Sequence, residues 1–144
     1  MAGADVLVIG AGPAGAMAAL VLARAGVRVR LIDRADFPRD KLCGDTLNPG
    51  SLAILDRQGL GEGIRARALP IRGMTVTGPG DASVTGEYPH RLTGASLMRR
   101  DLDMALVNAA VAAGAQFTPL VKVRGARVRG AISGVRAVTA HGEE

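Results

Sequence analysis

The chain has 144 residues and a mass of 14.7 kDa, which is enough for one domain with its own core but too short for two full domains. Hydrophobic residues make up 48% of the chain, which argues against a disordered chain, and aromatic residues only 2%, which predicts a core of Ala, Val, Leu and Ile, as in parallel strands covered by helices. The net charge of +5 comes from scattered arginines without interleaved aromatic residues, so we expect no nucleic-acid partner.

The first third of the chain has the pattern of a nucleotide-binding unit. An apolar, strand-like run from Val6 to Ile9 is followed by the glycine-rich segment Gly10 to Gly15 and by a helix-like run from Ala16 to Ala25. A second apolar run extends from Val27 to Ile32. This order of strand, G-x-G-x-x-G, helix and strand predicts a Rossmann-like βαβ unit that binds a dinucleotide.

Each residue of the glycine-rich segment has an expected role in cofactor binding. Gly10 lets the chain turn off the strand, Gly12 leaves room for the pyrophosphate, and Gly15 lets the helix pack against the strand. Pro13 and Ala14 open the helix, where free amides and the positive end of the helix dipole favour an anion. We therefore predict that the segment binds the cofactor phosphates.

Asp33 follows the second apolar run, eighteen residues after Gly15, close to the spacing of roughly 20 at which an acid accepts hydrogen bonds from a ribose. The neighbouring Arg34 would suit NADP, but an acid at the strand tip would repel a 2′-phosphate. FAD or NAD is therefore preferred over NADP. The competing interpretation of Asp33 is a solvated acid at a strand end.

The uncharged stretch from Val6 to Ala23 is long enough to resemble a membrane span. Three glycines and a proline interrupt it, and the residues before it include Asp5 and no Lys or Arg, so we expect neither a transmembrane helix nor a signal peptide. The single cysteine, Cys43, forms no internal disulfide, which favours a cytoplasmic location.

The middle of the chain predicts a loop, a helix and an inserted hairpin. A polar loop extends from Arg34 to Asp45, and Asn48-Pro49 opens a short helix from Gly50 to Arg57. Residues 69–77 have the pattern of a strand, and a return strand from Ala82 to Tyr88 follows a Gly-Pro-Gly-Asp turn. We expect an inserted β-hairpin at about residues 69–90.

The last third predicts a helix from about Arg100 to Ala113 and a strand from Gln116 to Val123, which would be the third parallel strand of the sheet. Two shorter β-like runs follow, Ala126 to Ile132 and Val135 to Ala140, divided by Ser133-Gly134. The last run has no expected partner. We therefore expect residues 1–144 to be the N-terminal part of an FAD-binding domain that ends in a partial β-meander, before the later FAD motifs.

Glycines predict where the three helices end, and helix periodicity predicts which residues of the two longer helices face inward. Glycines at 26, 59 and 114 are expected to end the three helices. The residues expected to face inward are apolar and helically spaced: Ala19 and Leu22 on the first helix, and Leu102, Leu106, Ala109 and Ala113 on the last.

Two segments after the glycine-rich unit resemble one family of flavoproteins. Residues 37–45, Phe-Pro-Arg-Asp-Lys-Leu-Cys-Gly-Asp, resemble the P-x-x-K-x-C-G segment of geranylgeranyl reductase-type flavoproteins, within the larger group of FAD-dependent monooxygenases and halogenases related to p-hydroxybenzoate hydroxylase. Residues 99–106 resemble that group's R-x-x-F-D-x-x-L helix start, with Leu102 in place of the usual Phe.

The resemblance implies an α/β fold in which FAD is bound in extended form. It implies that the flavin ring lies near the segment of Lys41, Cys43 and Gly44, that Arg34 lies by the adenosine, and that Arg99 lies near the phosphate side of the cofactor. It also implies NAD(P)H as the electron donor. Two later motifs of the family have no match in this sequence: a D-G segment after the meander, and a G-D segment that holds the ribityl chain and the pyrophosphate near the flavin.

We interpret the chain as part of an FAD-dependent oxidoreductase that transfers hydride through flavin N5. The substrate would be a small apolar or aromatic molecule: an isoprenoid alkene for a reductase, or an aromatic or polyketide-like compound for a monooxygenase. Peripheral membrane contact is compatible with such substrates. Two alternatives stay open, a non-catalytic nucleotide-binding fragment and an NAD-dependent dehydrogenase.

No catalytic residue can be named from the sequence, because the strands between Leu69 and Tyr88 show no pattern of acids, bases or metal ligands. Cys43 suggests a redox thiol whose pKa Lys41 would lower, but a single small cysteine is more often a packed side chain, and we favour packing. His90 and His141 have no partners at ligand spacing, so we expect no metal site.

Overall fold

The computed structural model describes residues 3–139 and 142–143, and its internal contacts divide the chain into two compact units. The first unit consists of residues 1–40 and 100–144, and the second of residues 41–99. Ala140 and His141, which the sequence analysis names, lie outside the described residues.

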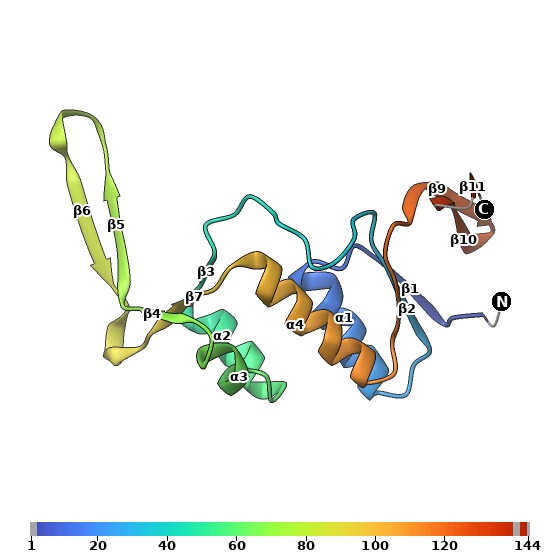
Figure 1. The fold of residues 1–144 in the computed structure, drawn as a ribbon, viewed down its shortest axis with the longest axis horizontal. Coiled ribbons are helices and arrows are strands. Elements are labelled where there is room, and N and C mark those ends of the chain that lie inside the picture. Colours follow the sequence, from blue (N-terminus) through green and yellow to red (C-terminus); the bar gives the residue numbers. More distant parts are fainter. Residues whose placement is uncertain (1–2, 140–141, 144) are drawn as a thin grey trace. The chain divides into compact units, whose positions relative to one another are not determined.

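The first unit contains the predicted parallel sheet. Its strands are β1 (Val6–Ile9), β2 (Val29–Ile32) and β8 (Gln116–Thr118), in the order β1-β2-β8, with β2 parallel to both neighbours. Helix α1 (Pro13–Arg24) connects β1 to β2 and packs on both strands (Figure 1). The expected third parallel strand is therefore confirmed, as residues 116–118.

Small and branched aliphatic side chains form the interior of the first unit, as the composition predicts. The largest of its fully buried apolar side chains are Leu20, Leu31, Leu106 and Val107. This composition suits a parallel sheet whose faces are covered by helices, because helices pack closely over small side chains. The predicted helix ends at glycines 26, 59 and 114 are also confirmed.

Helix α1 begins at Pro13, which confirms the prediction that Pro13 opens the helix; the apolar run from Ala16 is its continuation. Its buried side chains are Ala16, Ala19, Leu20 and Ala23. The predicted burial of Ala19 is confirmed. Leu22 is only half-buried, because it lies at the edge of the helix face that these four residues form.

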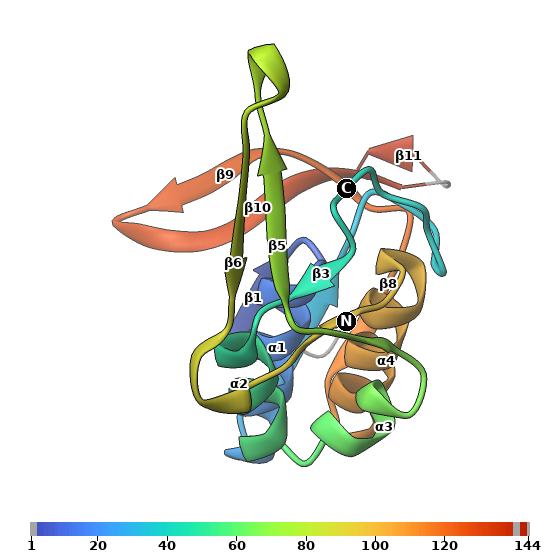
Figure 2. The same cartoon turned by 90° about the vertical axis from the view of Figure 1, so that its left-hand side faces the viewer.

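Helix α4 (Arg99–Ala112) lies beside α1 in both views (Figures 1 and 2). The predicted burial of Leu102 and Leu106 is confirmed, but Ala109 and Ala113 are only half-buried. The remaining buried positions are Asp103, Val107 and Ala110. An apolar pattern could not locate this face correctly, because one of its buried members is a charged residue.

The C-terminal part of the first unit is an antiparallel meander of β9 (Lys122–Arg129), β10 (Ala131–Thr139) and β11 (Gly142–Glu143). The predicted break at Ser133-Gly134 is wrong: the pairing only shifts register there, as in a β-bulge, and the chain turns at Gly130, where φ is +72°. The expectation that the last predicted strand lacks a partner is also wrong, because β10 pairs with β11.

The second unit contains a small antiparallel sheet in the order β3-β7-β4, made of β3 (Thr46–Leu47), β7 (Gly94–Ser96) and β4 (Leu69–Ile71). Helix α2 (Pro49–Arg57) follows β3, and helix α3 (Gly61–Arg65) follows α2. The predicted start of α2 is confirmed, since the Asn48 side chain accepts a hydrogen bond from the Ser51 amide at 2.8 Å. Strands β3 and β7 and helix α3 were not predicted, because they are too short to show periodicity.

The predicted hairpin is confirmed as β5 (Gly73–Thr77) and β6 (Ser83–Glu87), which pair in antiparallel register from Gly73–Glu87 to Thr77–Ser83 (Figure 2). The single strand predicted over residues 69–77 is interrupted at Arg72. Its first part, β4, pairs with β7, and only its second part pairs with β6.

Candidate functional site

The glycine-rich segment makes its turn directly after β1. Gly10 has φ of +99°, a conformation that residues with a side chain rarely adopt, and its amide donates to the carbonyl of Ile32 at 2.7 Å. The chain therefore leaves β1 sharply while it stays bonded to the end of β2.

Gly15 lies where helix α1 approaches the strand most closely. A Cβ atom at this position would overlap the carbonyl oxygen of Gly10 and stand 3.3 Å from Cγ1 of Val8. Any side chain here would force the helix away from β1. The close packing predicted for Gly15 is therefore confirmed.

The N-terminus of α1 offers hydrogen-bond donors and no negative charge. Gly12 precedes the helix in an extended conformation without a side-chain cap, Pro13 occupies its first turn, and the first turn contains no acidic residue. The amides of Ala14 and Gly15 have no acceptor within the helix, because they belong to its first turn. These residues fit the pyrophosphate of a dinucleotide, which needs bare amides at a positive helix end.

Asp33 is held at the tip of β2 against the glycine-rich segment. Its Oδ2 accepts a hydrogen bond from the Ala11 amide at 2.7 Å, and its Oδ1 accepts one from the Ala35 amide at 2.9 Å. Its own amide donates to the carbonyl of Thr118. Each carboxylate oxygen keeps a further lone pair, so the side chain can position the loop and still accept from a ribose hydroxyl. Arg34, the next residue, is exposed.

A buried ion pair that was not predicted from the sequence lies in the first unit. Nη2 of Arg39 lies 3.1 Å from Oδ2 of Asp103, and the two side chains are 16% and 0% exposed. The Arg39 guanidinium also lies over the Phe37 ring, 5.1 Å from its centroid, and that ring meets Phe117 edge to face. The pair ties the loop after β2 to α4. Only the family resemblance marked Asp103, as the D of the helix-start motif, without indicating its partner.

In the second unit, Cys43, Asp45 and Arg99 lie together. The Asp45 amide and the Arg99 guanidinium hydrogen-bond the Cys43 sulfur, and these two bonds lower the pKa of the thiol. Oδ1 of Asp45 in turn accepts from the Arg99 amide at 3.1 Å, and its carbonyl accepts from the Leu97 amide at 2.9 Å. Asp45 therefore connects the cysteine loop to the start of α4.

The packed side chain predicted for Cys43 is wrong, and the alternative in which Lys41 lowers the thiol pKa is not supported either. The cysteine is exposed, so it is not a packed side chain, because the loop around it faces solvent. Lys41 is not among the groups that lower the thiol pKa, although it is only two residues away, and Arg99, distant in sequence, takes that role. Lys41 and Gly44 lie exposed on the same loop.

The predicted site residues thus form two groups. Gly10, Gly12, Pro13, Ala14, Gly15 and Asp33 meet at the end of the parallel sheet. Cys43 and Arg99 meet in the second unit. Across residues 3–139 and 142–143, no three His, Cys, Asp or Glu side chains form a group that could hold a metal ion. No helix of this part of the chain is long and apolar enough to cross a membrane.

Comparison with known proteins identifies relatives over most of the chain. Menaquinone reductase of Mycobacterium tuberculosis is 43% identical over 116 residues, which cover 79% of this chain and 28% of that protein. A 6-methylpretetramide 4-monooxygenase of Streptomyces rimosus is 38% identical over 91 residues, covering 62% of this chain and 22% of that protein. The chain therefore spans less than a third of the length of these curated relatives.

Solved structures share the fold. The myxobacterial chondrochloren halogenase, a variant of FAD-dependent halogenases, superposes with a TM-score of 0.87 at 27% identity, over 98% of this chain and 34% of its own. The p-nitrophenol 4-monooxygenase of Pseudomonas putida superposes with a TM-score of 0.82 at 20% identity, over 96% and 37% of the two chains. Residues 3–143 match the family described as FAD binding domain, and since this match covers nearly the whole sequence, the chain belongs to that family of FAD-binding proteins.

Proposed function

We propose that this chain is the N-terminal, nucleotide-binding portion of an FAD-dependent oxidoreductase. The observation that carries the proposal is the meeting of three features at the end of the parallel sheet: a turn at Gly10, an uncapped helix start at Gly12 and a fixed carboxylate at Asp33. FAD, when bound, supplies hydride transfer through its N5 atom.

The residues of this chain would hold the two halves of the cofactor differently. The amides of Ala14 and Gly15 would donate to the pyrophosphate, and Asp33 would accept from the adenosine ribose, with Arg34 beside the adenosine. The loop of Lys41, Cys43 and Gly44 would lie near the flavin ring, and Arg99 would lie on the phosphate side. The hydrogen bonds of Asp45 to the start of α4 support this assignment, because they fix the cysteine loop.

For the whole enzyme we propose a small apolar or aromatic substrate and NAD(P)H as the electron donor. The 43% identity to a menaquinone reductase supports reduction of an isoprenoid or quinone-like molecule, for which peripheral contact with a membrane would be useful. The similarity to a 6-methylpretetramide monooxygenase supports the second candidate, oxygenation of an aromatic polyketide-like molecule.

FAD titration of the purified chain, followed by flavin fluorescence, tests the cofactor assignment. Gly12→Val should abolish binding, because its side chain would enter the path of the pyrophosphate. Gly3→Val is the matched control: a Cβ at Gly3 meets nothing within 4 Å, so this variant should bind FAD like the parent. Unchanged affinity in Gly12→Val would overturn the assignment of this loop.

The two alternatives give different results in the same assay. NAD binding tighter than FAD binding would favour an NAD-dependent dehydrogenase. FAD binding without NAD(P)H oxidation by the purified chain would fit a non-catalytic nucleotide-binding fragment, whereas steady-state oxidation would eliminate that alternative.

A further inference from the structure

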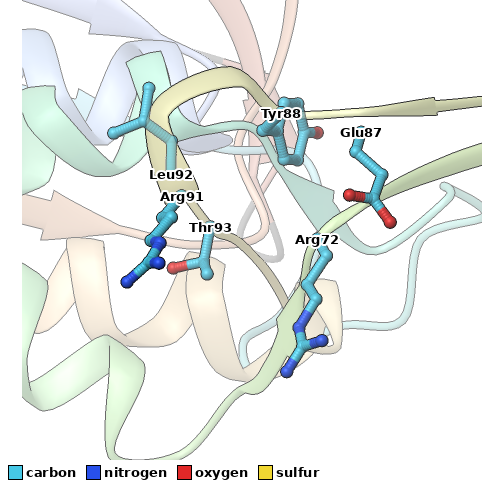
Figure 3. A pocket seen from close by; sticks show the side chains of 6 residues that line it. All are labelled: Arg72, Glu87, Tyr88, Arg91, Leu92 and Thr93. Atoms are coloured by element: carbon cyan, nitrogen blue, oxygen red, sulfur yellow. The ribbon is translucent and has the colours of Figure 1, made fainter.

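A hollow of about 440 Å³ lies at the base of the β5–β6 hairpin in the second unit (Figure 3). Small-molecule sites commonly occupy about 300–1,000 Å³, so the hollow has the size of a ligand site. It lies outside both groups of residues that the proposed function uses. Its lining residues are Arg72, Glu87, Tyr88, Arg91, Leu92 and Thr93.

The backbone around the hollow is held in place on both sides. The Tyr88 amide donates to the carbonyl of Arg72 at 2.8 Å, which joins the two strand ends. The Tyr88 ring lies so close to Gly94 that a Cβ there would stand 3.2 Å from it. The phenol on the wall of the hollow is therefore positioned by close packing.

The turn that carries Arg91 has an unfavourable backbone. His90 and Arg91 have φ of +56° and +58°, a left-handed conformation that is unfavourable for residues other than glycine. A hydrogen bond from the Leu92 amide to the Pro89 carbonyl at 3.0 Å closes the turn. Strained non-glycine residues persist where the surrounding structure holds them, and they cluster at ligand sites.

The hollow contains more hydrogen-bond donors than acceptors. Arg28, Arg39 and Arg65 each form an ion pair with an aspartate, whereas within the described part of the chain neither Arg72 nor Arg91 forms one. A guanidinium carries five N–H donors and no acceptor. The lining contains two guanidinium groups and one carboxylate, that of Glu87, so it has an excess positive charge.

We propose that this hollow binds a phosphate group of a small-molecule ligand through Arg72 and Arg91. Two guanidinium groups on separate segments, together with the hydroxyl groups of Tyr88 and Thr93 in the same lining, offer more donors than one carboxylate accepts. A phosphate has enough oxygens for both arginines. The ligand is either a dinucleotide with a 2′-phosphate, such as NADPH, or a phosphorylated substrate.

Calorimetric titration with inorganic pyrophosphate tests the site, in a Gly12→Val background so that the glycine-rich segment does not contribute. Arg72→Gln and Arg91→Gln should each weaken binding about tenfold, the loss expected for one charge-assisted hydrogen bond. Arg57→Gln, an exposed arginine of the same unit outside the hollow, should bind like the background. The lining arginines are exposed, so all variants should unfold at the same temperature, which is checked first.

The absence of pyrophosphate binding would overturn the proposal. Equal weakening of binding in all three glutamine variants would also overturn it, because it would reflect net charge alone. Displacement of pyrophosphate by NADPH but not by NADH would identify a dinucleotide 2′-phosphate as the source. Displacement by neither would support the site with a phosphorylated substrate as its ligand. FAD binding to Arg72→Gln, with Gly12 intact, should be normal, so failure of this proposal is distinguishable from failure of the FAD assignment.

Discussion

The parallel sheet of the first unit and the β5–β6 hairpin of the second are built from similar residues in different surroundings. Leu31 of β2 has no exposed surface, whereas Val76 of β5 and Val84 of β6, which face each other across the hairpin, are 66% and 73% exposed. Branched side chains favour strands in both places. Burial, and not strand formation, therefore distinguishes the parallel sheet, which contributes to a core, from the β5–β6 hairpin, whose valines remain exposed.

The same contrast applies to charged residues. Asp103 is fully buried against Arg39, whereas Asp5 pairs with Arg28 at a side-chain exposure of 47% and 68%. When one partner of a buried ion pair is removed, water cannot solvate the charge that remains. At an exposed pair, water solvates the remaining charge. Substitutions in the two environments should therefore differ in effect. Three experiments test this difference, and a fourth tests the thiol of Cys43.

The largest effect is expected at the buried ion pair. Asp103→Ala should lower the free energy of unfolding by about 3–5 kcal/mol, because it leaves the Arg39 guanidinium buried without its partner. Asp5→Ala, at the exposed pair, should lower it by about 1 kcal/mol or less. Urea unfolding followed by circular dichroism measures both values. Equal losses would mean that the buried pair contributes no more than the exposed one.

Truncation of strand side chains compares the two regions directly. Leu31→Ala in β2 should destabilise the chain by about 2–5 kcal/mol, since it leaves a cavity in a closed core. Val84→Ala in β6 should change stability by about 0.5 kcal/mol or less, since the side chain is already in water. The same urea experiment applies, and a large loss for Val84→Ala would show that the hairpin is buried in solution.

Two glycine substitutions test close packing against open space. Gly15→Ala should destabilise the chain by about 1–3 kcal/mol, because the new Cβ overlaps the Gly10 carbonyl oxygen. Gly63→Ala, in α3 with no atom within 4 Å, should be neutral or stabilise the chain by up to about 1 kcal/mol. Thermal unfolding separates the two, and identical melting temperatures would contradict the close approach of α1 to β1.

The smallest effect concerns the Cys43 thiol. The Asp45 amide and the Arg99 guanidinium favour the thiolate, so the rate of alkylation by iodoacetamide should rise with pH through a midpoint below the value of about 8.5 for an ordinary thiol. Arg99→Gln should move this midpoint upward. Lys41→Gln should leave it unchanged, and a shift in that variant instead would support the alternative in which Lys41 lowers the thiol pKa.

Several elements could be predicted because their signals are local. Strand β1, the glycine turn, the close approach at Gly15 and the third parallel strand all follow from residue type and spacing within a short window. The hairpin was predicted for the same reason, since a Gly-Pro-Gly-Asp turn lies between two β-like runs. The short strands β3 and β7 were missed, because they exist only through their pairing with each other.

By itself, the sequence determined a nucleotide-binding βαβ unit and, through two motifs, a resemblance to FAD-dependent enzymes, because backbone turns, helix starts and apolar periods are local properties. Tertiary structure alone decided that Asp103 pairs with Arg39 and that Arg99 rather than Lys41 acts on Cys43. These partners lie more than fifty residues apart, and an ion pair or a shifted pKa depends on distances between side chains that only the folded chain brings together.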